Sequence, residues 1–274
     1  MIQTSRELFA TATGAVAAFN VITVEHAEAI AAAAESAGTP VIMQLSQNAI
    51  RFHHGPRAIA AAMVAVAQTC DQPVVLHLDH ITEPELARQA SSLGFSSVMF
   101  DGAEHDYDTN VALTREIATW GTGHDVWVEA ELGKVGGKDG AHTPGVRTDP
   151  VEAAQFAADT SVDALAVAVG SSHAMTQRSA GLDIPLIQTI AGVVDIPLVL
   201  HGSSGVPDEG LVAAARAGMR KINIGTALNV AFTSAVRDWL TANEGVDPRK
   251  YITQARTAMT ECCTHYLRLL HDAV

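Results

Sequence analysis

Eight short apolar runs recur along this sequence, and each ends in polar or glycine residues. They are AVAAFNV (15–21), VIMQLS (41–46), VVLHLDH (74–80), SVMFDG (97–102), VWVEAELG (126–133), ALAVAVGS (164–171), LVLHGSS (198–204) and KINIGT (221–226). Alanine-rich stretches between them, such as residues 24–38, 56–70 and 83–94, have the periodicity of helices. Several of these stretches end in glycine directly before the next run, which is typical of a helix C-terminus. The chain therefore alternates strands with helices, as α/β folds do.

Two α/β architectures fit this alternation. Eight units of roughly 25–35 residues predict a (β/α)8 TIM barrel, which has a typical length of about 250 residues. A doubly wound open sheet usually carries a GxGxxG turn after its first strand, and the stretch AFNVIT has no such turn. We therefore predict one TIM-barrel domain over residues 1–274. Extra C-terminal helices, over about residues 227–274, would pack on the barrel or on another subunit.

Composition excludes several classes of function. The formal net charge of −13 argues against a nucleic-acid partner, because such a protein should carry a basic face. The three cysteines form no disulfide framework, and the first ten residues contain charges and no apolar leader. The apolar windows are too short and interrupted to cross a membrane. We expect a cytoplasmic enzyme or binding protein without a membrane partner.

The ends of the predicted strands are unusually polar. Their polar residues are Asn20, Gln44, Ser46, His77, Asp79, His80, Asp101, Glu129, Glu131, Ser171, Ser172, His173, His201, Ser203, Ser204, Asn223 and Thr226. In a TIM barrel the C-terminal strand ends converge on one mouth, where catalytic groups lie. Three of the strands end in histidine, and three imidazoles with an open fourth position are a common catalytic zinc site. If the histidines bind a metal, Asp101 and the two glutamates would orient their imidazole rings. Alternatively, each histidine is a packed core residue and the carboxylates are ordinary groups at the rim of the barrel.

Two loops have the composition of an anion site. HGSSGVPDE (201–209) and NIGTALN (223–229) follow the seventh and eighth strands, where TIM barrels often bind phosphate. Their glycines and serines would otherwise serve only as turn and helix-capping residues. The glycine-rich residues 133–150 exceed the usual connection length, which favours a mobile lid over an insertion without a role.

These motifs, in this order, resemble the class II, metal-dependent ketose-bisphosphate aldolases of the tagatose- and fructose-bisphosphate type. The matching segments are AFNV, HLDH, DGA, VEAELG followed by GG, AVGSSH, LVLHGSSGVPDE and NIGT, and the likeness continues to DPRKY at residues 247–251. The sequence departs from the family at Ala174, which is usually glycine. It also lacks a lid glutamate after GG, for which Asp139 is the candidate replacement.

The resemblance implies specific roles. One Zn²⁺ per subunit would be bound by His80, His173 and His201, with Asp101 and Glu131 in the polar shell around it. Asp79 would be the catalytic acid/base, assisted by Asp139, whereas His77 would be a packed residue or a residue that supports a ligand, and not a ligand itself. A phosphate, often with Na⁺ or K⁺ nearby, would bind Gly202, Ser203, Ser204, Asn223, Ile224, Gly225 and Thr226. Asn20, Gln44 and Ser46 would complete the substrate site, and Arg249 would reach a distal phosphate from a neighbouring subunit.

The resemblance also implies a reaction. Fructose or tagatose 1,6-bisphosphate would be cleaved reversibly to dihydroxyacetone phosphate and glyceraldehyde 3-phosphate through a zinc-stabilised enediolate, as in glycolysis and related carbohydrate metabolism. A homodimer or homotetramer is expected. Three alternatives remain open from sequence: an aldolase for a related ketose such as a deoxy-phosphogluconate, a metal-dependent epimerase or hydrolase, and a non-catalytic sugar-phosphate-binding relative.

Overall fold

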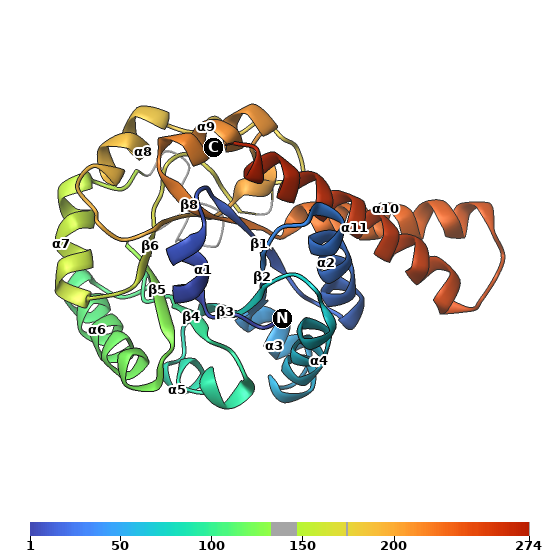
Figure 1. The fold of residues 1–274 in the computed structure, drawn as a ribbon, viewed down its shortest axis with the longest axis horizontal. Coiled ribbons are helices and arrows are strands. Elements are labelled where there is room, and N and C mark those ends of the chain that lie inside the picture. The colour runs from blue at the N-terminus through green and yellow to red at the C-terminus, as the bar shows by residue number, and fades with distance from the viewer. Residues whose placement is uncertain (133–146, 174, 274) are drawn as a thin grey trace.

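The computed structural model describes residues 1–132, 147–173 and 175–273. Its strands are β1 (Val16–Asn20), β2 (Val41–Ser46), β3 (Val74–Ile81), β4 (Ser97–Phe100), β5 (Trp127–Glu131), β6 (Ala164–Ala166), β7 (Leu198–Leu200) and β8 (Met219–Ile224). They pair in parallel and in sequence order, and β1 pairs with β8 to close the barrel (Figure 1). The predicted TIM barrel is confirmed, and all eight predicted strands are present.

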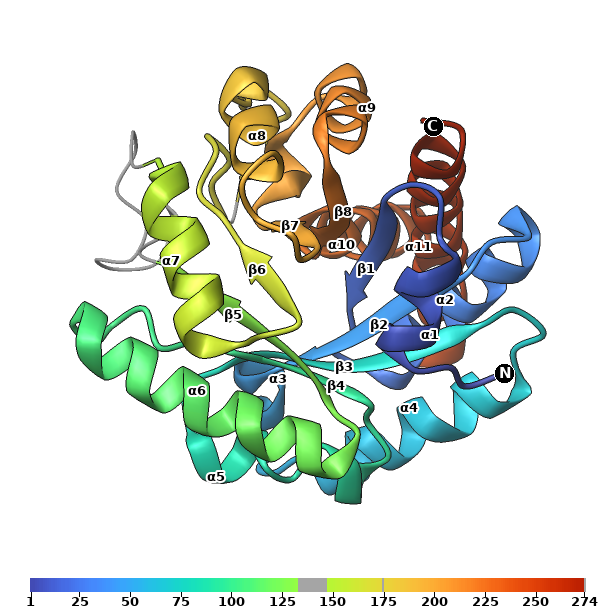
Figure 2. The same cartoon turned by 60° about the vertical axis from the view of Figure 1, so that its left-hand side comes forward.

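Helices surround this barrel (Figure 2). Their bounds are α1 (Ser5–Thr11), α2 (Val24–Ala37), α3 (Gln47–Phe52), α4 (Arg57–Thr69), α5 (Pro84–Ala87), α6 (Tyr107–His124), α7 (Pro150–Thr160), α8 (Ile184–Ala191), α9 (Asp208–Ala217), α10 (Thr226–Ala242) and α11 (Pro248–His271). Asp106, Asp149 and Asp183 cap the N-termini of α6, α7 and α8 with side-chain oxygens. Gly38 ends α2 with φ 68°, a conformation that glycine adopts without strain.

The helix predicted over residues 83–94 is wrong as a continuous element. The segment forms the short α5 and a separate 3₁₀ helix, Ser91–Leu93. Between them, the amides of Gln89 and Ala90 donate to carbonyls three residues earlier, so the backbone tightens and the α-helix ends.

The interior of the barrel is apolar at one end and polar at the other. Val16, Ala18, Ile42 and Val75 form one apolar cluster with Leu8 of α1. Met99, Trp127, Ala164, Ala166 and Val199 form another, against which Phe9 of α1 packs. Further along the strands, Asn20 pairs in register with Gln44, and Gln44 pairs with His77. The polar residues therefore lie toward the C-terminal strand ends, as the sequence predicts.

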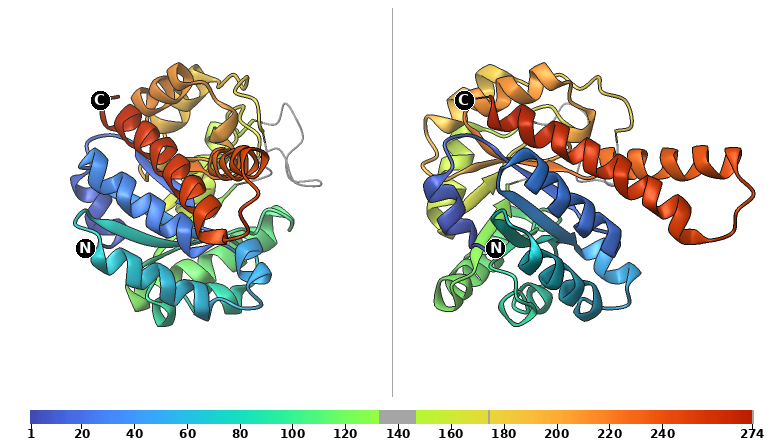
Figure 3. Two further views of the ribbon diagram at one scale, coloured as in Figure 1. Left: turned by 90° about the vertical axis from the view of Figure 1, so that its right-hand side faces the viewer. Right: turned by 45° about the vertical axis from the view of Figure 1, so that its right-hand side comes forward.

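The last two helices form a hairpin that projects from the barrel (Figures 1 and 3). The half of α11 that is closer to the barrel buries Met259, Cys263 and Leu267 at helical spacing, and α11 packs against α2 and β1. These are the extra C-terminal helices expected from the sequence. No helix within the three described ranges is long and apolar enough to span a membrane.

Candidate active site

A polar cavity of about 200 Å³ opens at the C-terminal end of the barrel. Its lining residues are Asn20, Ile22, Gln44, Ser46, Asn48, Asp79, His80, Ser172, His173, His201, Gly202, Ser204, Asn223, Gly225, Thr226 and Asn229. Most residues that the sequence singles out for metal, catalysis or phosphate binding thus share one cavity. Ser203 and Ile224 are buried and do not line it. Asp139 and Ala174 lie outside the described residues.

A local irregularity of β3 brings two consecutive residues to the same cavity. Successive side chains of a regular strand point to opposite faces. The pairing of β3 with β4 shifts register between Leu78 and Ile81, and His80 has φ 49°, which is uncommon for a residue other than glycine. The shift allows His80 to reach the cavity beside Asp79.

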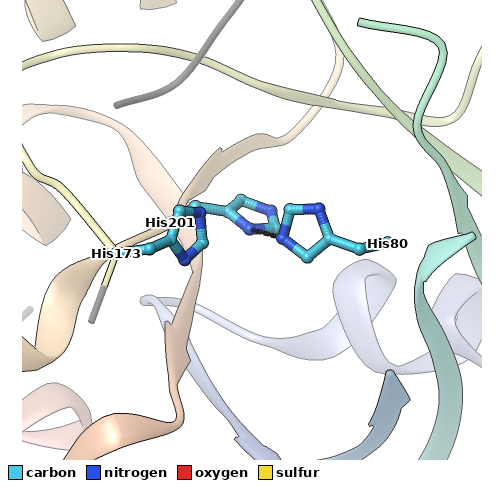
Figure 4. Close-up of side chains that lie close together, drawn as sticks. All are labelled: His80, His173 and His201. Carbon is cyan, nitrogen blue, oxygen red and sulfur yellow. Dashed lines mark hydrogen bonds between the residues drawn. The ribbon is translucent and has the colours of Figure 1, made fainter. Parts of the chain in front are cut away.

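Three histidines converge, His80 from β3, His173 from the loop after β6 and His201 directly after β7 (Figure 4). The ring of His80 lies 4.7 Å from that of His201 and 5.2 Å from that of His173, centroid to centroid. One ring nitrogen from each histidine lies within 4.8 Å of those of the other two. The same criterion also groups His80 with Asp101 and Glu131.

Carboxylates fix the orientation of two of these rings. Asp101 Oδ2 lies 3.1 Å from His80 Nδ1, and Glu129 Oε1 lies 3.0 Å from His201 Nε2. An ionised carboxylate only accepts hydrogen bonds, so each ring donates on its outer side. The inner nitrogens, His80 Nε2 and His201 Nδ1, are 2.9 Å apart, and each would present a lone pair to a metal ion once the proton between them is released. A single cation between them satisfies both, so the donor set fits a metal ion.

Electrostatics favour positive charge at His80. Burial opposes its protonation, but the negative charge of Asp79 and the hydrogen bond to Asp101 outweigh burial and raise the pKa of His80 to about 9. Burial and the neighbouring charge of His80 hold the pKa of His201 well below its usual value. The pair therefore holds one positive charge, which is the charge that a bound metal ion would replace.

Asp79 is held as a carboxylate. Burial raises its pKa, but the positive charge of His80, further nearby charges and a hydrogen bond outweigh burial, so the net pKa is lowered. Asn20 Nδ2 donates to Asp79 Oδ2 over 2.8 Å, and Gln44 Nε2 donates to Asn20 Oδ1 over 3.1 Å. Asp79 Oδ1 is buried and has no hydrogen-bond partner among the described residues. One oxygen is thus fixed while the other is left to accept a proton.

Two glycines allow the loops after β7 and β8 to approach their neighbours. Gly202 has φ 67°, and a Cβ atom there would lie 2.6 Å from the backbone carbon of Ser172. A Cβ atom on Gly225 would lie 2.7 Å from Asn20 Oδ1. Ser204 Oγ accepts from the amide of Ala227, while Ser203 Oγ donates to the carbonyl of Asn223. These contacts place the N-terminus of α10 at the cavity, where its dipole favours an anion.

The structure adds residues that the resemblance does not assign. Asn48, Ser172 and Asn229 line the cavity, and Glu129 rather than Glu131 is hydrogen-bonded to His201. Asn48 and Asn229 are single polar residues of the helices α3 and α10, and a helix shows the same pattern on a side that faces solvent.

His77 and Arg249 lie away from the three converging imidazoles. His77 contacts Ser97 and Lys221, as expected for a packed residue. Arg249, at the start of α11, is 88% exposed and paired with Asp247, outside the cavity of its own chain. Its predicted role needs a second copy of the chain and stays a prediction.

Known proteins are similar to this chain in sequence and in fold. A profile of the family described as class-II fructose-bisphosphate aldolase matches residues 4–273. A 6-phospho-5-dehydro-2-deoxy-D-gluconate aldolase from Bacillus velezensis is 39% identical over 258 residues, covering 93% of this chain and 89% of the relative. The enzyme of the same name from Bacillus subtilis is 38% identical over the same shares.

A solved structure extends the comparison. The YdjI aldolase of Escherichia coli K12 superposes with a TM-score of 0.84 at 30% identity, over 98% of this chain and 97% of that one. The family match covers nearly the whole sequence and includes every residue around the cavity. The chain therefore belongs to the class II fructose-bisphosphate aldolase family, and is an aldolase, a lyase that acts on carbon–carbon bonds.

Proposed function

We propose that this chain is a zinc-dependent aldolase that cleaves 6-phospho-5-dehydro-2-deoxy-D-gluconate, a phosphorylated keto acid. The observation that supports this substrate assignment is the sequence identity of 37–39% to four relatives of that name, over 90% or more of this chain. The proposal replaces the fructose and tagatose bisphosphates expected first from sequence with the deoxy-phosphogluconate alternative.

The substrate's structure defines the reaction. Its ketone lies between a phosphorylated carbon and a hydroxyl-bearing carbon, and the next carbon carries the hydroxyl that loses a proton. Breaking the bond between those two hydroxyl-bearing carbons gives dihydroxyacetone phosphate and 3-oxopropanoate. The half of the substrate that becomes dihydroxyacetone phosphate has the same groups as the corresponding half of a ketose 1,6-bisphosphate. One scaffold therefore suits both kinds of substrate.

His80, His173 and His201 would hold the zinc ion. Their ring nitrogens converge, and carboxylates occupy the outer nitrogens of His80 and His201. When bound, the metal supplies a Lewis acid that polarises the ketone and stabilises the negative charge developing on its oxygen. A monovalent cation near the phosphate is a further part of the proposal, carried by family resemblance alone.

Asp79 would move the proton. Its Oδ2 accepts from Asn20, while its Oδ1 is left without a partner in the described part of the chain. In cleavage, Oδ1 would take the proton of the substrate hydroxyl as the carbon–carbon bond breaks, and in condensation it would return it. Its lowered pKa keeps the carboxylate ionised and ready to accept.

Backbone groups would bind the phosphate. The loops at Gly202–Ser204 and at Gly225–Thr226 are joined by the bond from the Ala227 amide to Ser204 Oγ. Arginine and lysine are absent from the described lining of the cavity, so amides, hydroxyls and the α10 dipole would supply the attraction.

The test measures dihydroxyacetone phosphate released by the zinc-loaded protein from three substrates in parallel. We expect kcat/KM for 6-phospho-5-dehydro-2-deoxy-D-gluconate to exceed those for fructose and tagatose 1,6-bisphosphate by about 100-fold or more, a difference of about 2.7 kcal/mol in transition-state binding. A higher value for either bisphosphate would overturn the substrate assignment. Release from none of the three, with zinc bound, would overturn it as well.

A further inference from the structure

A lysine lies buried inside the barrel beneath the cavity, although the proposed reaction does not use it. Lys221 on β8 is 2% exposed. It is absent from the residues that line the cavity. It therefore has no route to the substrate, and any effect it has on the reaction must pass through its neighbours.

Lys221 reaches across the interior to a strand that is not its neighbour. Its Nζ lies 2.6 Å from Glu129 Oε2 on β5, whereas the strands hydrogen-bonded to β8 are β7 and β1. Glu129 is 1% exposed, so both charges are removed from water. A buried charge is tolerated when it is paired and hydrogen-bonded, and these two groups satisfy that condition for each other.

Glu129 connects this ion pair to a proposed metal ligand. Its second oxygen, Oε1, accepts from His201 Nε2 over 3.0 Å. A neutral imidazole carries one proton, so donation from Nε2 leaves the lone pair on Nδ1. That atom faces His80 Nε2 at 2.9 Å, inside the three-histidine cluster. The Glu129 carboxylate thus sets which nitrogen of His201 is available to a metal.

The ammonium is held from its other side as well. His77 Nε2 lies 3.2 Å from Lys221 Nζ, and His77 Nδ1 lies 2.6 Å from Ser97 Oγ. Because an ammonium only donates, His77 Nε2 accepts, and Nδ1 donates to Ser97. Ser97, His77, Lys221, Glu129 and His201 form one continuous hydrogen-bonded row through the barrel interior.

We propose that Lys221 is a positioning residue for the metal site: by anchoring and neutralising Glu129, it holds His201 with Nδ1 directed at the metal. The proposal rests on the three-histidine metal site of the proposed function, but not on the identity of the substrate. Without the ammonium, the carboxylate would lose both its anchor and its compensating charge, and His201 would lose its fixed orientation.

Zinc affinity of Lys221→Met, measured by competition with a chromogenic chelator, tests this directly. The methionine keeps most of the side-chain volume and removes the charge. We expect zinc affinity to fall by about 10- to 100-fold, the usual effect of losing a partner of a metal ligand. The visible absorption of the Co²⁺-loaded protein should change as well, because the donor geometry changes. Excess zinc should restore part of kcat with little change in KM. Lys250→Met, at an exposed lysine on α11, is the control and should match the wild type.

Two further variants keep the test decisive. Glu129→Gln should weaken zinc binding similarly. The double variant K221M/E129Q removes both charges and gives a neutral replacement if the single variants fail to fold. Since both residues act through His201, the double variant should lose no more zinc affinity than the single variant that loses more.

A folded K221M or K221M/E129Q protein with wild-type zinc affinity and an unchanged Co²⁺ spectrum would overturn the role of Lys221. Failure of the wild-type protein to bind zinc would instead overturn the metal site of the proposed function, so the two failures are distinguishable.

Discussion

Asp79 and His80 are consecutive in the sequence, yet both side chains line the same cavity. The register shift of β3 and the positive φ of His80 make this possible. The arrangement puts a proton acceptor directly beside a metal ligand, so that one substrate can contact both. It also means that the two roles can be separated by mutation, because each residue acts through its own side chain.

Replacing Asp79 with asparagine should abolish most turnover while leaving the metal in place. The amide keeps the shape and can still contact Asn20, but it cannot accept the hydroxyl proton. We expect kcat to fall by about 10²- to 10⁴-fold, the range for loss of a general base. Zinc content, measured by atomic absorption, should stay near that of the wild type. A D79N protein with wild-type kcat would contradict the assigned role.

Asn20→Ala should impair the same step indirectly. Asn20 holds Asp79 Oδ2 and is itself held by Gln44. Loss of this contact lets the carboxylate rotate, and misplacement of a catalytic group by about 1 Å can cost about 10²-fold in rate. We expect a fall in kcat of that order with zinc affinity unchanged, from steady-state kinetics and chelator competition. Asn243→Ala, at an exposed residue after α10, is the control. Equal kinetics of the two variants would show that Asn20 does not orient Asp79.

Adding a methyl group at Gly202 should damage both stability and activity. The left-handed φ disfavours alanine, and its Cβ would collide with the backbone of Ser172, next to His173. Such strain costs about 1–3 kcal/mol, which urea denaturation can measure. Zinc affinity should fall too, because the loop carrying His173 must move away. If G202A is as stable and as active as the wild type, the close approach of the two loops is not required.

His26 should make stability depend on pH. It is buried at the start of α2 and stacks on Phe232 of α10, and burial lowers its pKa to about 4. An unfolded histidine has a pKa of about 6.5, so between pH 6.5 and 4 the unfolded chain binds the extra proton. The stabilisation is complete above pH 6.5 and is lost as the pH falls toward 4.

This contribution is measurable by urea denaturation at two pH values. From pH 7 to pH 5, His26 alone should cost about 2 kcal/mol of the free energy of unfolding. His26→Gln removes the titrating group, so the stability difference between wild type and variant should shrink by that amount at pH 5. A difference that is independent of pH would contradict the assignment.

The eight strands and the convergence of three histidines were predictable because both depend on patterns that a sequence displays. Alternating strand and helix segments define the barrel, and barrel topology brings strand ends to one mouth. The family match adds the identity of the reaction class.

Other features were not predictable. Periodicity does not reveal the register shift at Asp79–His80, since a bulge leaves composition unchanged. A lysine in a strand gives the same signal on the surface and in the interior, and Lys221 meets Glu129 only across the barrel. The helix over residues 83–94 failed because its backbone tightens after one turn, where local propensity favours continuation.

The most direct test of metal-dependent cleavage is the release of dihydroxyacetone phosphate from 6-phospho-5-dehydro-2-deoxy-D-gluconate before chelation, after EDTA and after zinc is restored. We expect activity to disappear with the metal and to return when about one zinc ion is bound per chain. The His173→Ala variant should recover far less at the same zinc concentration. Activity that survives complete metal removal, and that borohydride abolishes in the presence of dihydroxyacetone phosphate, would contradict the zinc mechanism and indicate a lysine imine instead.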